Sequence, residues 1–296
     1  MSYITPLQAL WSSVIITAIY PVVGKLAVGS VSPLAIVLLG TLGTALIYVP
    51  WLCKKGYWRL LFRRDLFFKF AAVGLFGTAL PYLLIFIALN YTTPANSAIL
   101  NQTEVIYSLI LSAVFLKEYP SKKQLFGTAV LICGVGLLLA GEGLSVKLKG
   151  DLIILATVWM FQVSHIAAKK LPADIPDNLI VCARALFGFL CTVPTAFILT
   201  RFDVPFYCGF SLKSVLILLF MAVFNNLIGN IFWYKAIRNM ALAKATAVIL
   251  VYPVFTYLLS AALGYDKLKM TQILGLLLAM GGAYMVTNTI RKGTEK

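Results

Sequence analysis

Apolar residues in this chain are gathered into long runs that are separated by short polar connections. Each run has roughly 18 to 22 residues, which lets a helix rising about 1.5 Å per residue cross ~30 Å of hydrocarbon. The pattern therefore predicts an all-α membrane protein with ten transmembrane helices. The ten runs lie at residues 7–28, 32–52, 69–89, 95–116, 124–141, 151–169, 179–200, 213–234, 243–264 and 272–289.

The second half of the sequence repeats the first at an offset of 148 residues, without a gap from about Tyr82 to Met285. Each half would hold five helices, and because five is odd, the second copy must enter the membrane from the opposite face. We therefore expect two inverted five-helix repeats, at residues 1–141 and 150–290. Matching positions include Trp11 and Trp159, Glu118 and Asp266, Gln124 and Gln272, Gly127 and Gly275, and Gly134 and Gly282.

The composition agrees with a membrane protein. Of all residues 61% are hydrophobic and 12% are charged, which is roughly half the charged fraction of a soluble domain. The net charge of +15 does not indicate nucleic-acid binding, because the basic residues sit at the ends of apolar runs. If the N-terminus is cytoplasmic, 17 Lys and Arg residues lie at cytoplasmic ends and 7 on the other side. By the positive-inside rule, we expect both termini in the cytoplasm and a multi-pass protein in the plasma membrane, with its lipids as partners.

Short motifs recur at equivalent places in the two halves. A Trp lies early in the first helix of each half, at Trp11 and Trp159. The end of the fourth helix with the residues that follow it, 112–127, has its second copy within the stretch 252–275. These motifs make the chain similar to the EamA family of the drug/metabolite transporter superfamily. The resemblance implies ten helices, a central cavity between the halves and transport of a small organic solute. Members of that family include exporters of amino acids and other metabolites.

Two charged side chains lie well inside apolar runs, Glu104 in the fourth and Arg184 in the seventh. A charge in mid-membrane is costly unless it faces a cavity or a partner. Glu104 is therefore a candidate site for a proton or for a cationic group of the solute, and helical spacing places Asn101 on its face. The alternative is a structural carboxylate fixed by Arg184 or by neighbouring amides. Arg184 could in turn bind a solute carboxylate or lock a helix pair, and the structural role is favoured.

Other polar side chains fall at equivalent positions of the two halves. Asn226 and Asn230 share a face of the eighth predicted helix, and the repeat places Thr78 and Tyr82 at the same positions of the third. The equivalence predicts that both halves line one central cavity. Hydrogen bonding between helices is an equally good interpretation of these residues.

The sixth predicted helix carries the one histidine of the chain, His165, near one face with Trp159 and Gln162. His165 is a candidate proton relay, because imidazole exchanges protons near neutral pH, although a structural role near the cytoplasmic end is favoured. The pseudo-symmetric Trp11 and Trp159 could form aromatic walls around a solute or belong to an interfacial belt. The other candidates for such walls are Tyr82, Tyr107 and Tyr252, whereas Trp233 is assigned mainly to the interface.

Prolines occur inside three predicted helices, at Pro21, Pro81 and Pro253. Proline has no backbone N–H, so each one leaves a carbonyl one turn earlier without its usual partner. In a membrane helix such a carbonyl is tolerated where it lines a cavity or meets another donor. We therefore expect polar backbone to be exposed near these prolines.

These observations favour a secondary transporter that moves a small organic metabolite, such as an amino acid, an amine or a related solute, by alternating access. The sequence has no phosphate-cradling Gly-Lys-Ser/Thr loop, so the energy must come from gradients or from the solute. Export is the favoured direction, and proton coupling stays open. A channel or lipid scramblase is the main alternative, and an intramembrane enzyme is the least favoured one. We expect no cofactor, no metal site and a monomer.

Overall fold

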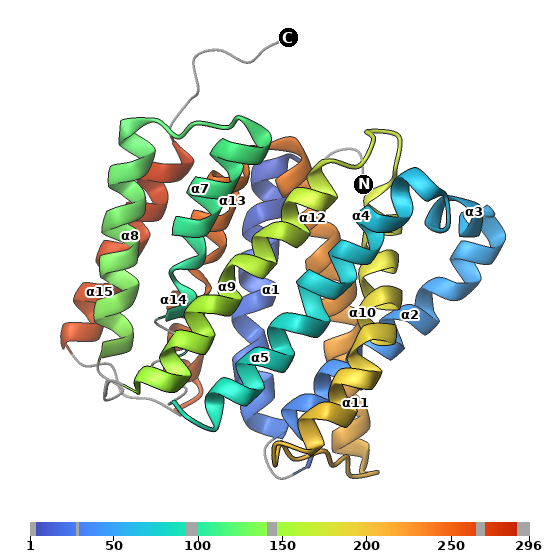
Figure 1. The fold of residues 1–296 in the computed structure, drawn as a ribbon. Helices are drawn as coiled ribbons and strands as arrows, with labels where there is room; N and C mark the ends of the chain where they lie inside the picture. The colour runs from blue at the N-terminus through green and yellow to red at the C-terminus, as the bar shows by residue number, and fades with distance from the viewer. Residues whose placement is uncertain are drawn as a thin grey trace.

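The computed structural model describes residues 4–27, 30–92, 97, 100–140, 147–264 and 270–288. Within these residues all the regular secondary-structure elements are helices, and the helices form one bundle (Figure 1). The sequence-predicted all-α class is therefore confirmed. The elements are α1 (Pro6–Ala27), α2 (Pro33–Lys55), α3 (Trp58–Leu61), α4 (Arg64–Gly74), η1 (Leu75–Ala79), α5 (Leu80–Leu89), α7 (Glu104–Leu116), α8 (Lys122–Ala140), α9 (Leu148–Lys169), α10 (Asp177–Thr200), α11 (Leu212–Phe220), η2 (Met221–Gly229), α12 (Asn230–Asn239), α13 (Leu242–Ile249), α14 (Tyr252–Ala262) and α15 (Met270–Thr287).

Eight helical stretches in the described part of the chain are long and apolar enough to cross a membrane. They correspond to eight of the ten predicted runs, and the largest boundary differences are in the third, which begins at Arg64, and the eighth, which ends at Asn239. The runs at 95–116 and 124–141 fall on α7, a shorter apolar helix, and on α8. The number ten thus stays a prediction.

Three of the long stretches are not regular α-helices along their whole length. A π-helical segment, η1, joins α4 to α5, and a longer one, η2, joins α11 to α12. A turn at residues 250–251 separates α13 from α14, and a similar turn at 102–103 precedes α7. Irregular backbone inside a membrane helix is tolerated where protein or a cavity satisfies its polar groups. We therefore expect a cavity or polar contacts near these four places.

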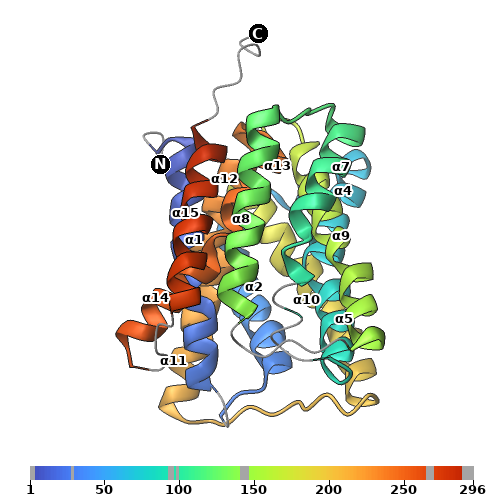
Figure 2. The same ribbon diagram turned by 90° about the vertical axis from the view of Figure 1, so that its left-hand side faces the viewer.

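The helices α8 and α15 pack against each other through glycines and lie side by side in both views (Figures 1 and 2). A Cβ built on Gly134 would come 2.3 Å from the backbone nitrogen of Ala279, and one on Gly282 would come 2.5 Å from that of Leu131. Backbone atoms cannot move aside as side chains do. The two helices therefore approach as closely as they do only because these residues lack a side chain.

The chain enters and leaves the bundle at one end: α1 begins where α15 ends, which we call the termini end (Figure 1). In contrast, α9 begins at the opposite end. Many large apolar side chains on the outside of the bundle are exposed, for example Phe68 at 77%, Leu277 at 66% and Phe197 at 65%. An apolar surface of this extent suits contact with lipid rather than water.

Candidate functional site

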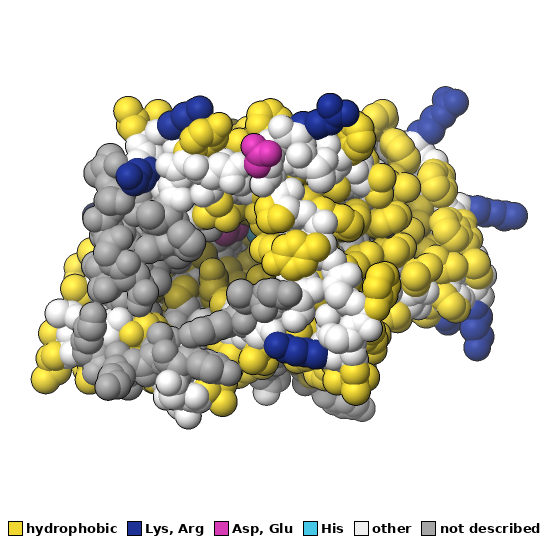
Figure 3. All heavy atoms as spheres, turned by 90° about the horizontal axis from the view of Figure 1, so that it is seen from below, with side chains coloured by type: hydrophobic (Ala, Val, Ile, Leu, Met, Phe, Trp, Pro, Cys, Tyr) yellow, Lys and Arg dark blue, Asp and Glu magenta, His cyan; other side chains and the backbone are white. Residues whose placement is uncertain are grey.

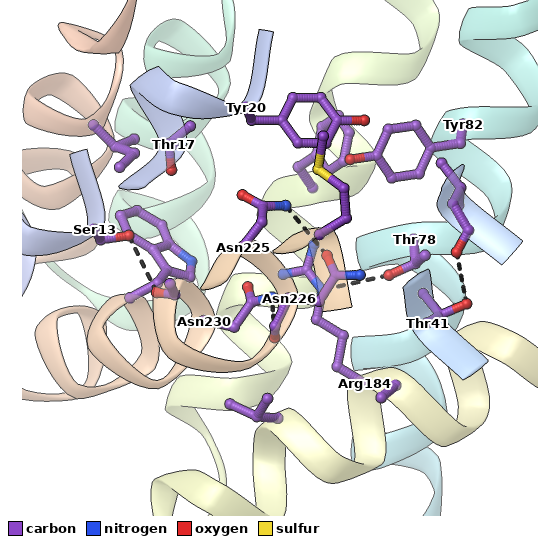
Figure 4. Close-up of a pocket in the computed structure, with 18 of the residues that line it drawn as sticks. Ser13, Thr17, Tyr20, Thr41, Thr78, Tyr82, Arg184, Asn225, Asn226 and Asn230 are labelled. Atoms are coloured by element: carbon purple, nitrogen blue, oxygen red, sulfur yellow. Dashed lines mark hydrogen bonds between the residues drawn. The ribbon is translucent and has the colours of Figure 1, made fainter. Parts of the chain in front are cut away.

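A cavity of about 230 Å³ lies in the centre of the bundle. The space needed for one water molecule is only ~10–15 Å³ on a comparable measure, so an organic molecule fits. Seen from the end opposite the termini, the surface is hollowed between apolar walls (Figure 3). The polar lining residues are Ser13, Thr17, Tyr20, Thr41, Thr78, Tyr82, Glu104, His165, Arg184, Asn225, Asn226, Asn230, Trp233 and Tyr252, several of which are drawn in Figure 4.

Arg184 reaches the cavity from α10 and is held there by the irregular backbone of η1. Its Nη2 donates to the carbonyl of Gly77 at 2.7 Å, its Nε lies 3.4 Å from Thr78 Oγ1, and its Nη1 lies 3.3 Å from the hydroxyl of Tyr234. Gly77 stands four residues before Pro81, so its carbonyl lacks the usual helical donor. Near Pro81 a guanidinium group therefore bonds the backbone carbonyl of Gly77, as the expectation of polar backbone near the prolines would allow.

Glu104 begins α7 directly after the turn at 102–103, and its carboxylate lines the cavity. The buried Gln162 of α9 donates its Nε2 to Glu104 Oε1 at 2.7 Å, and His165 Nδ1 lies 4.0 Å from the same oxygen. Within the described residues, no Arg or Lys nitrogen lies within 4.0 Å of the Glu104 carboxylate. Arg184 is therefore not its ion-pair partner, and of the two structural interpretations of Glu104, the amide contact is the one present.

The segment η2 and the first residue of α12 together carry an asparagine group that faces the cavity. Asn225 Nδ2 donates to Asn226 Oδ1 at 3.2 Å, and Asn230 Nδ2 donates to the carbonyl of Asn226 at 2.8 Å. Gly40 of α2 makes room for this group, because a Cβ there would come within 3.0 Å of Asn226 Nδ2. The amides thus form hydrogen bonds among themselves and with the backbone of their own helix, and they also line the cavity (Figure 4).

Aromatic rings line part of the remaining wall of the cavity. Tyr20 of α1 and Tyr82 of α5 point toward each other across it (Figure 4). Tyr82 meets Phe161 edge-on at 6.3 Å between ring centroids. Trp233 meets the imidazole of His165 edge-on at 5.0 Å and is only 6% exposed. The assignment of Trp233 to the interface is therefore wrong, because its ring is buried against His165 in the lining of the cavity.

The structure brings eight of the sequence-predicted site residues to the cavity and leaves five outside its lining. The eight are Thr78, Tyr82, Glu104, His165, Arg184, Asn226, Asn230 and Tyr252. The five outside the lining are Trp11, Asn101, Tyr107, Trp159 and Gln162. Trp11 packs edge-on against Phe255, and Trp159 lies against Phe76. The hydroxyl of Tyr107 donates to the carbonyl of Leu155, and Gln162 contacts Glu104.

A polar stripe on the first helix was not predicted from the sequence. Ser13, Thr17 and Tyr20 of α1 all line the cavity. They are spaced by four and three residues, which places them on one face of a helix. The signal was therefore present as helical spacing, but single hydroxyl groups in an apolar run are a weak indication of a site.

A group of charged contacts lies at the termini end of the bundle. Glu118 Oε1 pairs with Lys169 Nζ at 2.9 Å, and Glu118 Oε2 accepts from the backbone N–H of Leu242, the first residue of α13, at 2.7 Å. The same Lys169 also donates to the carbonyls of Ile237 and Met240. These contacts tie the end of α7 to the ends of α9 and α12, above the cavity.

Long apolar helices around a polar, solute-sized cavity define a multi-pass membrane protein of the solute-transporting type. The chain belongs to the EamA-like transporter family, whose profile matches residues 7–140 and, a second time, residues 148–288. The resemblance to this family of drug/metabolite transporters is thereby confirmed.

Individual relatives agree with this assignment. The uncharacterized transporter YetK of Bacillus subtilis is 29% identical over 245 residues, which is 80% of this chain and 69% of that protein. A protein of Salmonella typhimurium named a probable amino-acid metabolite efflux pump is 24% identical over 212 residues, covering 69% and 71% of the two chains. A crystal structure with 16% sequence identity superposes with a TM-score of 0.80 over 97% of this chain and 99% of the other, which shows a shared fold.

Proposed function

We propose that this protein is a secondary transporter that moves a small organic metabolite by alternating access, with two inverted five-helix repeats rocking about the central cavity. The repeats are residues 1–141 and 150–290, which together give ten transmembrane helices. The observation that carries the proposal is that the cavity is lined from both halves at positions separated by one constant offset. The pairs of lining residues that stand 148 apart include Ser13 and Phe161, Thr17 and His165, Thr78 and Asn226, Tyr82 and Asn230, and Glu104 and Tyr252.

The irregular backbone supports the same offset. Shifting η1 by 148 residues gives 223–227, which lies inside η2, and shifting the turn at 102–103 gives 250–251. The opposite starting ends of α1 and α9 support an inverted relation between the copies (Figure 1). In transporters of this construction, the solute site lies near the midplane, at the interface of the repeats, where helices are interrupted.

The two ends of the cavity support an alternating-access cycle. The end opposite the termini is hollowed (Figure 3), whereas at the termini end the ion pair of Glu118 and Lys169 joins the end of α7 to the end of α9. We infer that the structure represents the state that is open opposite the termini. With the termini in the cytoplasm of the cell, this is an outward-open state. The name of the Salmonella relative supports a metabolite of the amino-acid type and export as the direction.

Glu104 is the residue proposed to bind the solute or to exchange a proton with it. The substitution Glu104→Gln keeps the shape and the contact to Gln162 but removes the charge. We expect it to reduce transport at least about tenfold, since a charge-assisted hydrogen bond contributes ~1.5–3 kcal/mol. The measurement is saturable counterflow of radiolabelled amines and amino acids in proteoliposomes. The matched control is Asp174→Asn, the same chemical change on an exposed loop. Unchanged counterflow in Glu104→Gln would refute the role.

The same vesicles test the alternative of a channel or scramblase. A carrier saturates with solute and exchanges it across the membrane, whereas a channel gives flux that does not saturate. Non-saturating conductance, or transfer of fluorescent lipid between leaflets at the same rate in the presence of solute, would replace the transporter with one of these two activities.

A further inference from the structure

The cationic side chain of Arg184 lines the cavity, but each of its nitrogens already makes a hydrogen bond to the protein, which uses three of its five N–H donors. Each of its three nitrogens is directed at a group of the protein: the carbonyl of Gly77, the hydroxyl of Thr78 and the hydroxyl of Tyr234. The edge formed by Nε and Nη2, which would hold a carboxylate with two parallel hydrogen bonds, faces η1. Binding a solute carboxylate there would break the contacts that satisfy the free carbonyl before Pro81.

Glu104 is in the opposite situation. An ionised carboxylate has two oxygens and about four acceptor positions, and the contacts described above use Oε1 alone, through Gln162. The nearest cationic candidate is His165, whose Nδ1 is 4.0 Å away, and among the described residues that nitrogen donates no hydrogen bond. The cavity therefore offers a negative centre with acceptor capacity to spare.

The walls near this carboxylate fit a cation as well. Tyr20, Tyr82, Trp233 and Tyr252 line the same cavity, and aromatic faces attract ammonium groups, more strongly where water is excluded. The amide oxygens of the asparagine group add neutral acceptors. Apart from Arg184 and His165, none of the lining residues that the structure describes is a Lys, Arg or His. Among these described residues Arg184 is therefore the one permanent cation, and because it is already bonded to the protein, it compensates a second negative charge brought by a solute poorly.

We propose that the solute is an organic ammonium ion, recognised through Glu104 and the aromatic walls, and that a carboxylate on the solute is not required for binding. This inference rests on the proposed function and narrows its substrate class. An amine is therefore expected to bind at least as tightly as the amino acid with the same side chain, and the corresponding carboxylic acid is expected to be excluded.

The test uses three molecules with one ring and different charges: phenethylamine, phenylalanine and 3-phenylpropionate. Binding to the purified full-length protein is measured by calorimetry and by thermal shift, because a ligand of the native state raises the unfolding temperature. We expect phenethylamine to bind, phenylalanine to bind equally or more weakly, and 3-phenylpropionate to bind at least about tenfold more weakly than the amine. Glu104→Gln should weaken the amine at least about tenfold, and Asp174→Asn should not change it.

Arg184→Gln separates the two charged residues. It should lower the unfolding temperature of the protein while keeping the amine ahead of the acid. A lost preference for the amine in this variant, binding of phenylalanine or the acid but not the amine, unchanged amine binding in Glu104→Gln, or no binding of any probe would each overturn the inference. Failure of the proposed function looks different: the probes bind in the predicted order, but no solute shows saturable counterflow in vesicles.

Discussion

Two of the places where the halves of the sequence meet are built from opposite kinds of residue. At the α8–α15 seam, glycines let backbones touch and leave no space: Gly134 stands against Ala279 and Gly282 against Leu131. Around the cavity, the meeting surfaces carry hydroxyl, amide and charged groups, and their helices are interrupted at η1 and η2.

This difference separates two tasks of one repeated unit. In lipid, helices associate by close packing rather than by excluding water, so small residues hold a seam together. Polar groups and irregular backbone cost stability there unless they serve a site. A seam in which an added Cβ would lie 2.3 Å from backbone has one arrangement, whereas a polar cavity with spare acceptors can rearrange around a solute. We therefore expect α8 and α15 to stay together while other helices move.

The largest expected effect concerns this packed seam. Gly134→Ala places a Cβ 2.3 Å from the nitrogen of Ala279, a backbone atom that cannot turn away. We expect a loss of ~3 kcal/mol or more in the free energy of unfolding, the upper range for overpacking. The matched control is Gly136→Ala on the same helix, where nothing lies within 4 Å. Alanine there should be neutral or stabilise by up to ~1 kcal/mol. Unfolding in detergent measures both, and equal values would mean that the seam has room for a methyl group.

The long runs and their boundaries could be predicted from the sequence, because the length of an apolar run sets whether a helix spans a membrane. Four cavity residues, Thr78, Tyr82, Asn226 and Asn230, could also be predicted, since they are polar and fall at equivalent positions of the repeat. The repeat was informative here because residues at equivalent places in two facing copies point at the same space.

The rest of the site depends on contacts that hydropathy does not encode. A π-helical segment changes which face a residue points to without changing the apolar run, so the inward turn of Trp233 was not visible. The partner of Arg184 is a backbone carbonyl, which every residue has, and only the place of Pro81 hinted at which one. Trp11 and Trp159 recur in the repeat yet pack against Phe255 and Phe76, because equivalence alone does not say which face looks inward.

The second prediction concerns the termini end, where the ion pair of Glu118 and Lys169 joins the two halves of the sequence. Glu118→Gln removes the ion pair with Lys169 but keeps an oxygen for the N–H of Leu242. The partly buried pair joins the two halves, so we expect its loss to raise the population open at this end roughly tenfold, about 1.4 kcal/mol. The reporter is a cysteine in place of the buried Ser108, which bonds Thr246 across the halves, in a chain without its native cysteines. Its rate of modification by a water-soluble thiol reagent should rise accordingly.

The control for that experiment is another carboxylate at the same end. Asp177 pairs with Arg238 at 2.7 Å, but both residues lie in the second half, and Arg238 keeps the carbonyls of Pro172 and Ile175. Asp177→Asn should therefore leave the modification rate of the reporter unchanged. Equal acceleration in both variants would indicate general loosening of this end rather than release of a contact between the halves.

The smallest expected effect concerns a single hydroxyl beside the cavity. Thr44 of α2 lies with its Oγ1 2.9 Å from the carbonyl of Ala222 in η2, so it joins the irregular segment to a helix of the other half. The same Oγ1 also lies 2.9 Å from the carbonyl of Gly40 in its own helix. Thr44→Val keeps the shape and removes both contacts, and we expect a loss of ~0.6 kcal/mol in the free energy of unfolding from the contact between the helices, the average for such hydrogen bonds in membranes. Thr192→Val is the matched control, because Thr192 is equally buried and donates to the carbonyl of Gly188 in its own helix. The difference in unfolding free energy between the two variants measures the contribution of the hydrogen bond between the halves. Identical losses would mean that this bond adds nothing beyond a hydroxyl bonded within its own helix. At the α8–α15 seam, one added methyl group is expected to lower the free energy of unfolding by ~3 kcal/mol or more. If the loss in Thr44→Val is near ~0.6 kcal/mol, η2 tolerates a change better than that seam does, which would make η2 the more adaptable region.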